Sequence, residues 1–247
     1  MNDSAPAPTF KLASYNIHKA VGTDRQRDPL RILKVLAEVD ADIVVLQEAD
    51  RRFGTRDRTL PDFLVEQHSD YVPVPFDVQH DSMGWHGNSI MVRRDISVID
   101  HDVLHIPYLE PRGVVTATLQ LPGGAELSVF GMHLDLSGLW RVRQARAIAE
   151  LAQAAQQERP TLLAGDLNEW RPNGGCLKEF ARHFTLLDCG RSFHSQRPLG
   201  RLDRIMHGPS LEAVDFGVHH SPLASRASDH LPVWADLRAP AKQAAAT

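Results

Sequence analysis

The chain contains two β-α-β segments of the same design, and each delivers an acidic residue near the end of its second strand. In the first segment, a strand is predicted over 11–17, a helix begins at Asp28-Pro29, and a strand over 42–48 ends at Glu48. Asp is a favoured N-cap and Pro is favoured at the first helical position, and leucines then recur at helical spacing. The segment therefore predicts two strands joined through a helix.

The second segment repeats this design between 126 and 168. Its first strand, 126–134, carries His133 near its end, and its second strand, 160–168, ends with Asp166 and Asn168. The helix between them is expected to bury one face, made of Leu139, Val142, Ala145, Ile148, Ala149 and Ala152. Because ligands of open α/β sheets bind outside the carboxyl ends of strands, the two segments predict a pseudo-symmetric double sheet that shares one cleft.

The rest of the chain supplies further strands and irregular loops. Strands are expected over 87–94, 96–104, 113–121, 201–207, 212–220 and 230–237, and several of them alternate apolar and polar residues. The triplet Pro122-Gly123-Gly124 predicts a hairpin turn. The region 53–82 is predicted to form loops over the cleft, with one short helix near 61–68.

Length and composition indicate one soluble domain. The 247 residues fit a single domain, which we place at 10–238 between flexible termini at 1–9 and 239–247. Two cysteines provide no disulfide framework, and the N-terminus lacks the basic and apolar regions of a secretory signal. No stretch approaches the roughly 18 apolar residues of a membrane span. We therefore expect a cytoplasmic monomer.

The charge balance bears on the partner. The chain has 27 basic and 31 acidic residues and a net charge of −4, with a pI near 6.3. It lacks the high positive charge of proteins that bind long nucleic acids through their phosphates. Nucleic acid is therefore disfavoured as a partner without being excluded. Four arginines beyond Glu48 either line a phosphate-binding groove or form a solvated basic loop. They are Arg51, Arg52, Arg56 and Arg58.

Three oxygen-bearing side chains at strand ends are candidate metal ligands. Glu48, Asn16 and Asp229 offer the oxygen atoms that Mg²⁺ prefers. A hard cation there would neutralise charge that develops on a phosphoester. Each residue alone also has an ordinary explanation, because an acid at a strand end is often a helix cap or an ion-pair partner, and Asn16 suits a turn.

The string GDLNEW, residues 165–170, is the sharpest local signal. Gly165 permits close backbone approach, and Asp166 can orient and deprotonate a water molecule. The amide of Asn168 can hold that Asp and donate to a phosphate oxygen. The alternative is an Asx turn with no catalytic role.

Two histidines stand beside acidic residues or at strand ends. Asp229 and His230 precede the last strand, and both can serve one cleft only from a loop, since neighbouring strand residues point to opposite faces. Asp203 can hydrogen-bond His230 and favour its protonated form, or the bond can simply tie two strands together. His133 is either a general acid for the leaving oxygen or a buried core histidine.

Eight strings occur in one order from Tyr15 to Val233: SYNIHKA, DIVVLQE, HGNSIMV, RGV, MHLDL, LLAGDLNEW, RLDRI and SDHLPV. Together they resemble the endonuclease/exonuclease/phosphatase superfamily, and most of all a small bacterial group of unassigned substrate. The resemblance implies a four-layer α/β/β/α sandwich of two mixed sheets. It also implies Mg²⁺ or Mn²⁺ at Glu48, with Asn16 and Asp229 assisting.

The resemblance further implies a role for each remaining site residue. Asp166 activates water, Asn168 and His230 stabilise the pentacovalent phosphorus, and Asp203 supports His230. Abasic-site endonucleases carry a Tyr at the position of His133, so the chain is more similar to the deoxyribonuclease, sphingomyelinase and phosphatase branches. The residues carried over for substrate binding are Asn88, Arg112 and Arg141. For Arg141, a solvated helix arginine is the alternative.

These inferences predict a Mg²⁺-dependent phosphodiesterase that hydrolyses its substrate by in-line attack of water, without a covalent enzyme intermediate. The same site would suit a phosphomonoester. Net charge favours a lipid head group or small phosphate ester as substrate, and an endonuclease or exonuclease is the rival interpretation. A non-catalytic binding module with the same fold is the third hypothesis, and it predicts that some of the metal ligands would be replaced.

Overall fold

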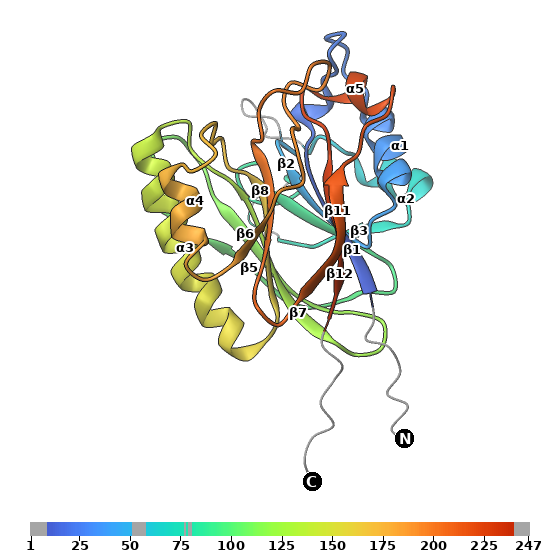
Figure 1. Ribbon diagram of the computed structural model, residues 1–247. Helices are drawn as coiled ribbons and strands as arrows, with labels where there is room; N and C mark the ends of the chain where they lie inside the picture. The colour runs from blue at the N-terminus through green and yellow to red at the C-terminus, as the bar shows by residue number, and fades with distance from the viewer. Residues whose placement is uncertain (1–8, 51–57, 77, 79–80, 240–247) are drawn as a thin grey trace.

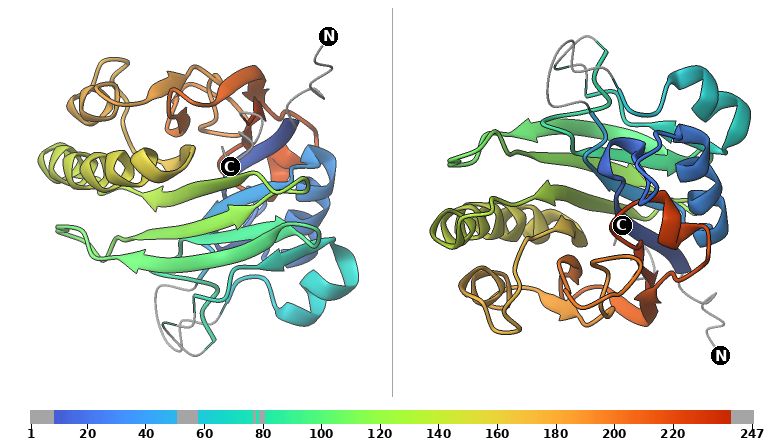
Figure 2. Two further views of the ribbon diagram at one scale, coloured as in Figure 1. Left: turned by 90° about the horizontal axis from the view of Figure 1, so that it is seen from below. Right: turned by 90° about the horizontal axis from the view of Figure 1, so that it is seen from above.

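The computed structural model describes residues 9–50, 58–76, 78 and 81–239, which form a four-layer α/β/β/α sandwich (Figure 1). Two mixed sheets of six strands pack face to face. The helices α1 (Pro29–Val39) and α3 (Gly138–Glu158) lie on opposite outer sides of the molecule (Figure 2). The fold class predicted from the sequence is confirmed.

The first sheet has the strand order β11-β12-β1-β2-β4-β3. Its strands are β1 (Thr9–Asn16), β2 (Ile43–Gln47), β3 (Tyr71–Pro73), β4 (Ser89–Arg93), β11 (Glu212–Val218) and β12 (Val233–Arg238). Strands β1 and β2 are parallel and α1 connects them, while the other pairs are antiparallel. Three shorter helices contact α1: η1 (His18–Ala20), α2 (Asp62–His68) and α5 (Ala224–Ala227).

The second sheet repeats this plan with the order β5-β6-β7-β8-β10-β9. Its strands are β5 (Ser97–Leu104), β6 (Val114–Gln120), β7 (Glu126–His133), β8 (Thr161–Asp166), β9 (Thr185–Leu187) and β10 (Asp203–His207). Strands β7 and β8 are parallel and α3 connects them. The helix α4 (Gly175–Phe180) packs against α3. The two halves are therefore related by pseudo-symmetry, as the two β-α-β segments predicted.

Apolar residues form one core between the sheets and one beneath each helical layer. The sheets approach closely at Gly131 of β7, where an added Cβ would lie 2.8 Å from Val45 of β2. Asp28 caps α1 by accepting a hydrogen bond from the N–H of Arg31, with Pro29 as the first helical residue. Both features match the prediction.

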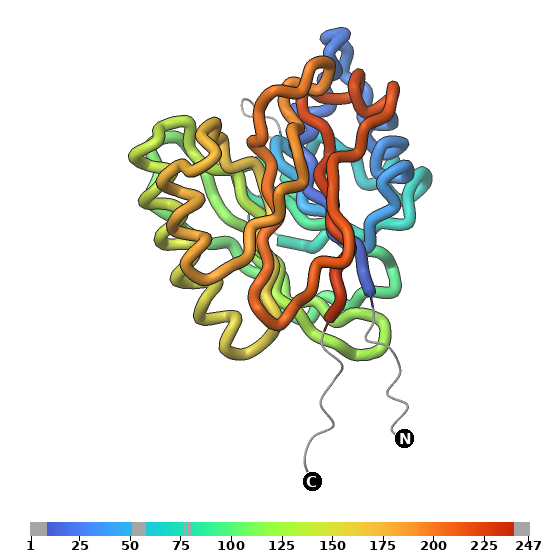
Figure 3. Tube along the Cα trace, in the orientation of Figure 1, coloured from blue at the N-terminus to red at the C-terminus, as the bar shows by residue number. Residues whose placement is uncertain are grey.

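The structure corrects three details of the prediction. Leu139 was expected on the buried face of α3, but it is 63% exposed, and the buried residues of α3 begin only at Gln144. Thr9 and Ala239 were placed in the termini, but Thr9 pairs with Arg238 and Ala239 is buried. The remaining terminal residues, 1–8 and 240–247, lie outside the described residues. Figure 3 shows that the two ends of the described chain leave from the same end of the sandwich.

Candidate active site

The carboxyl ends of β1 and β8 meet, although the two strands belong to different sheets. Asn16 ends β1, Asp166 ends β8, and Asn16 Nδ2 donates a hydrogen bond to Asp166 Oδ2 at 3.1 Å. Gly165 has a φ of 155°, and a Cβ there would lie 1.9 Å from the carbonyl oxygen of Met132. Close approach of β8 to β7 therefore requires glycine at this position.

The turn after β8 holds the other oxygen of Asp166. Asn168 has a left-handed backbone with φ 50°, and its N–H donates to Asp166 Oδ1 at 2.9 Å. Its Nδ2 donates to the carbonyl oxygen of Leu134, also at 2.9 Å. This is the Asx turn that the sequence allowed as an alternative. It is compatible with a catalytic role, because it leaves Asp166 Oδ2 directed toward Asn16.

Three donor side chains surround Asp166 Oδ2. Besides Asn16, His133 Nε2 lies at 3.4 Å and His230 Nε2 at 3.7 Å. Asp166 is only 1% exposed. Burial raises the pKa of its carboxyl above the ordinary value, while the neighbouring charge of His230 opposes this rise. A buried carboxylate with a raised pKa among convergent donors is typical of a functional site.

His230 is held as a cation by the acidic residues around it. Its Nδ1 lies 2.8 Å from Asp203 Oδ2, and that oxygen also accepts a hydrogen bond from Ser192 Oγ at 2.5 Å. Burial alone would lower the pKa of His230, but the charges of Asp203 and Asp166 outweigh it and raise the pKa to about 10. His230 precedes β12, so it occupies the loop position that the sequence required. The predicted Asp203–His230 contact is present.

His133 is held in a single tautomer by Arg112. Arg112 Nη1 lies 2.8 Å from His133 Nδ1, and a guanidinium group can only donate. His133 Nδ1 must therefore accept, and the single ring proton is on Nε2, which faces Asp166. Arg112 is 4% exposed and also pairs with Glu110. In this arrangement Nδ1 of His133 is the acceptor and Nε2–H is the donor that faces Asp166.

The candidate metal ligands Glu48 and Asp229 both face the segment 16–19. Glu48 forms an ion pair with Lys19, and Asp229 Oδ1 lies 3.7 Å from His18 Nδ1. The third candidate, Asn16, accepts a hydrogen bond from the N–H of His18 through its Oδ1. Two carboxylates and one amide oxygen match the oxygen-donor chemistry of a hard divalent cation. The residues present therefore fit the group that the resemblance implies.

A second acidic cluster lies nearby and fits a metal less well. Ligand atoms of Asp166, Asp203 and His230 all lie within 4.8 Å of one another. However, His230 Nδ1 is already engaged by Asp203 Oδ2 at 2.8 Å, which leaves only its Nε2 facing Asp166, at 3.7 Å. Asp203 is also committed to His230 and Ser192. We therefore favour the oxygen set around Glu48.

The remaining residues predicted to bind substrate are engaged in structural contacts. Asn88 Nδ2 donates to the carbonyl oxygens of Trp85 and Gly113, at 3.2 Å and 3.0 Å. Arg141 donates to the carbonyl oxygen of Leu136 at 2.6 Å and pairs with Glu169 at 3.4 Å. Arg141 is thus neither a solvated helix arginine nor directed at Asp166 in this structure.

The basic loop beyond Glu48 is only partly described. Arg58 pairs with Asp62 of α2 and donates to the carbonyl oxygen of Ser82. It therefore fixes this loop to α2. Arg51, Arg52 and Arg56 lie outside the described residues, so the groove they were predicted to line stays a prediction.

Several residues that shape the site were missed by the sequence interpretation. Lys19 and Asp135 lay inside matching strings but were given no role, whereas Ser192 and Phe193 carried no local signal. Phe193 packs its ring against the His230 imidazole, with centroids 4.8 Å apart. Ser192 and Phe193 belong to the loop between β9 and β10, so only the fold brings them to His230.

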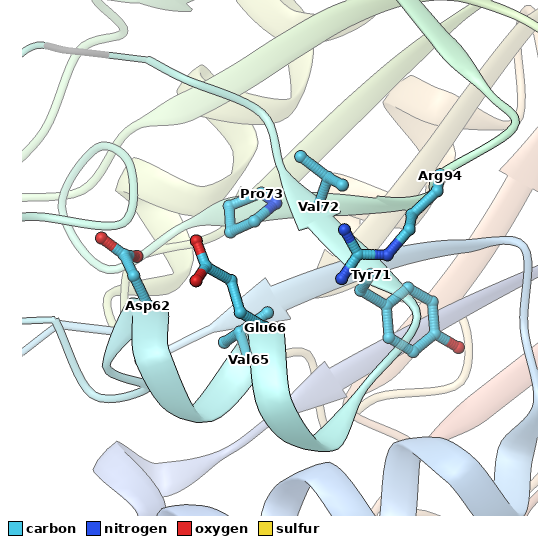
Figure 4. Close-up of a pocket in the computed structure, with 7 residues that line it drawn as sticks. All are labelled: Asp62, Val65, Glu66, Tyr71, Val72, Pro73 and Arg94. Atoms are coloured by element: carbon cyan, nitrogen blue, oxygen red, sulfur yellow. The ribbon is translucent and has the colours of Figure 1, made fainter.

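A separate pocket of about 150 Å³ lies between α2 and β3 (Figure 4). Asp62, Val65 and Glu66 line it from the helix, and Tyr71 and Arg94 are on its other side. No residue predicted for the site lines it. The two carboxylates and one guanidinium give it no defined chemistry, so we assign it no function.

This combination of fold and site defines a class. Residues 13–230 match the family model described as the Endonuclease/Exonuclease/phosphatase family, and the chain belongs to this family. The family consists of phosphoester hydrolases. No helix in the described part of the chain combines the length and apolar character that a membrane span requires.

Individual relatives are similar along most of their length. The uncharacterized protein YbhP of Escherichia coli K12 is 26% identical over 261 residues, covering 96% of this chain and 99% of the relative. An endonuclease/exonuclease/phosphatase from Bacteroides vulgatus has a TM-score of 0.76 at 17% identity, covering 94% of this chain and all of that one. The mannosyl-6-phosphatase Bt3783 of Bacteroides thetaiotaomicron has a TM-score of 0.72 at 20% identity, covering 92% of this chain and 99% of that one. These solved structures share the fold.

Proposed function

We propose that this protein is a divalent-metal-dependent phosphodiesterase in which Asp166 activates the attacking water. The observation that carries the proposal is the convergence of Asn16, His133 and His230 on Asp166 Oδ2, where the two sheets meet. This arrangement places a buried base among donors that suit a phosphate group.

The chain's own residues divide the chemistry between them. Asp166 takes a proton from water as the water attacks phosphorus in line with the leaving oxygen. The His230 imidazolium and the second N–H of the Asn168 amide donate to the oxygens on which negative charge develops. Asp203 keeps His230 oriented and protonated. Water attacks directly, so no covalent enzyme intermediate forms.

His133 acts as a neutral donor in this proposal. Its Nε2–H faces Asp166 and is fixed there by Arg112 at Nδ1. It therefore orients Asp166 or a non-bridging phosphate oxygen. Between the two histidines, only His230 carries a proton that it can transfer to the leaving oxygen.

A divalent cation, Mg²⁺ or Mn²⁺, would be held by Glu48 and Asp229 with the Asn16 amide oxygen. When bound, it would neutralise negative charge on the phosphoester and polarise its oxygen atoms. The donor set supports this assignment, because two carboxylates and one amide oxygen face the segment 16–19.

The proposed substrate is a lipid head group or a small phosphate ester. The net charge of −4 favours these over long nucleic acid. Nuclease activity is the second candidate, since the same residues would cleave a nucleic acid diester. Both cysteines are buried free thiols, which supports our proposal of a cytoplasmic location, and we further propose a monomer.

Hydrolysis of bis(p-nitrophenyl) phosphate tests the proposal. Purified protein is expected to release nitrophenolate with Mg²⁺ or Mn²⁺ and to lose this activity in EDTA. Faster release from p-nitrophenyl phosphate than from the diester would assign a phosphomonoesterase instead. A non-catalytic binding module would hydrolyse neither ester with any cation.

A further inference from the structure

Six large apolar side chains are exposed on the loops that follow the strand ends of the second sheet and on the first turn of α3. Each is between 53% and 63% exposed, so none of them contributes to the core. They are Tyr108, Leu109, Leu136, Leu139, Trp170 and Leu199. We call this set the apolar rim. Exposed apolar residues gathered in one region mark interaction sites more often than scattered ones do.

One part of the rim lies beside His133. Asp135, two residues after His133, accepts hydrogen bonds through Oδ2 from the N–H groups of Leu109 and Glu110, at 3.2 Å and 3.1 Å. Its Oδ1 accepts from the N–H of Ser137 at 2.8 Å. Asp135 therefore fastens the loop carrying Tyr108 and Leu109 to the loop carrying Leu136. The exposure of these side chains reflects a fixed loop geometry.

The other part of the rim lies beside His230. Trp170 packs edge to face on Phe193, with centroids 5.7 Å apart, and Phe193 packs on His230. The N–H of Leu199 donates to the carbonyl oxygen of Phe193 at 2.6 Å. Arg141 links the two parts, because it contacts both Leu136 and Glu169, the residue before Trp170. The apolar rim thus borders the candidate site, with one part beside His133 and the other beside His230.

Basic residues on these loops and on α3 complement an anionic partner. Arg143, Arg171 and Arg197 are exposed, and Arg143 lies over the Trp140 ring at 4.9 Å. The acids of these loops are paired or buried: Glu110 pairs with Arg112, Glu169 pairs with Arg141, and Asp135 is 1% exposed. Basic residues beside exposed Trp, Tyr and Leu are typical of surfaces that bind anionic lipid.

A partner that covers the rim must present apolar surface and a phosphoester together. Four of the six rim residues are leucines, which do not stack on nucleic acid bases as aromatic rings do. We infer that the rim docks the site on a bilayer that contains anionic phospholipid, with a lipid phosphoester facing Asp166. This inference rests on the proposed function for the reaction, but the docking itself is measurable without it.

Sedimentation with lipid vesicles tests the docking. The full chain is expected to pellet with phosphatidylcholine vesicles that contain phosphatidylglycerol, and more weakly with phosphatidylcholine alone. The double variant Leu136→Gln/Leu139→Gln should lower the partition coefficient by about tenfold, because two exposed leucines no longer enter the interface. The matched control is Ile99→Gln/Leu151→Gln, which changes two leucine-sized side chains that are 50% and 45% exposed elsewhere. The control should bind like the unchanged protein.

Two results would overturn the inference. The first is that the unchanged protein does not pellet with either kind of vesicle. The second is that both double variants lose binding equally. Binding of a single-stranded oligonucleotide that Trp170→Ala abolishes, in a protein that ignores vesicles, would identify a nucleic acid surface instead.

Hydrolysis of bis(p-nitrophenyl) phosphate separates docking from catalysis. Both double variants should keep the unchanged rate on this soluble ester, since none of the four residues belongs to the proposed catalytic or metal-binding set. Normal vesicle binding without hydrolysis would refute the proposed reaction and leave the docking intact. Normal hydrolysis without vesicle binding would refute the docking alone.

Discussion

At the scale of single residues, the site depends on which protons the histidines carry. His133 and His230 both approach Asp166 Oδ2, but through opposite partners. Arg112 donates to one imidazole and keeps it neutral, whereas Asp203 accepts from the other and keeps it charged. Two histidines of the same chemical type thus have neighbours of opposite charge, which supports the different roles proposed for them.

Replacement of His133 should therefore reduce the hydrolysis rate by the same factor for good and for poor leaving groups. Loss of a general acid slows the reaction most when the leaving group is poor. Loss of a neutral orienting donor slows the reaction equally for good and poor leaving groups. We expect His133→Ala to lower the rates on an alkyl phosphodiester and on bis(p-nitrophenyl) phosphate by similar factors. Both rates are measured on variants whose circular dichroism matches the unchanged protein. A much larger loss on the alkyl ester would show that His133 protonates the leaving oxygen.

Glu48→Gln should weaken metal binding. The change removes one negative charge and alters one ligand of a hard-cation site. Isothermal titration calorimetry should show lower Mg²⁺ affinity, and excess Mg²⁺ should restore part of the activity. Glu158→Gln, at the exposed end of α3, is the matched control and should leave both properties unchanged. Unaltered Mg²⁺ affinity in Glu48→Gln would exclude Glu48 as the metal anchor.

At the scale of the elements, local patterns predicted most of the secondary structure. The two β-α-β segments could be predicted because helix caps and apolar periodicity lie within short stretches of sequence, as at Asp28 and Pro29. The three-residue strands β3 and β9 and the short helix α4 were missed, because so few residues carry little periodicity.

Side-chain pairing within the site was less predictable than its residue types. Asp203 and His230 could be paired because both matched known strings. The contact of Arg112 with His133 and that of Lys19 with Glu48 depend on how the loops fold over the strand ends. No spacing in the sequence encodes those contacts.

The junction of β7 and β8 should tolerate no side chain at Gly165. An added Cβ would lie 1.9 Å from the Met132 carbonyl oxygen, so the strands would have to separate. We expect Gly165→Ala to destabilise the fold by about 3 kcal/mol or more, measured by urea denaturation. Gly123→Ala is the matched control, because Gly123 also has positive φ but no atom lies within 4 Å of the added Cβ. This control variant should cost about 1 kcal/mol, the penalty of a Cβ in a left-handed backbone. Equal losses would show that φ alone matters at Gly165.

The contact of α1 with the segment before α5 should weaken in acid. Burial alone would raise the pKa of the Glu38 carboxyl, but hydrogen bonds from Ser221 and His219 outweigh it and lower the pKa below its ordinary value. A lowered carboxyl pKa stabilises the fold above the unfolded value and loses this contribution as pH falls through the folded value. The melting temperature of Glu38→Gln should thus lie below that of the unchanged protein at neutral pH and approach it in acid. A difference in melting temperature that stays constant at every pH would contradict this contribution. Glu66→Gln is the control and should show no such pH-dependent difference.

At the scale of the whole molecule, two similar halves build one asymmetric site. Each half contributes a parallel strand pair, yet Asn16 comes from one sheet and Asp166 from the other. The sandwich positions these strand ends within hydrogen-bonding distance, while both described chain ends leave from the opposite end of β1. The loops that carry the apolar rim are thereby free to meet a surface.

The kcat of Asp166→Asn on bis(p-nitrophenyl) phosphate tests most directly whether the meeting point of the β1 and β8 ends is the catalytic centre. Asn is nearly isosteric and still accepts a hydrogen bond, but it cannot take a proton from water. We predict a folded variant whose kcat falls by about 10²-fold or more while KM changes little. A folded Asp166→Asn protein with near-normal kcat would contradict the assignment of Asp166 as the base.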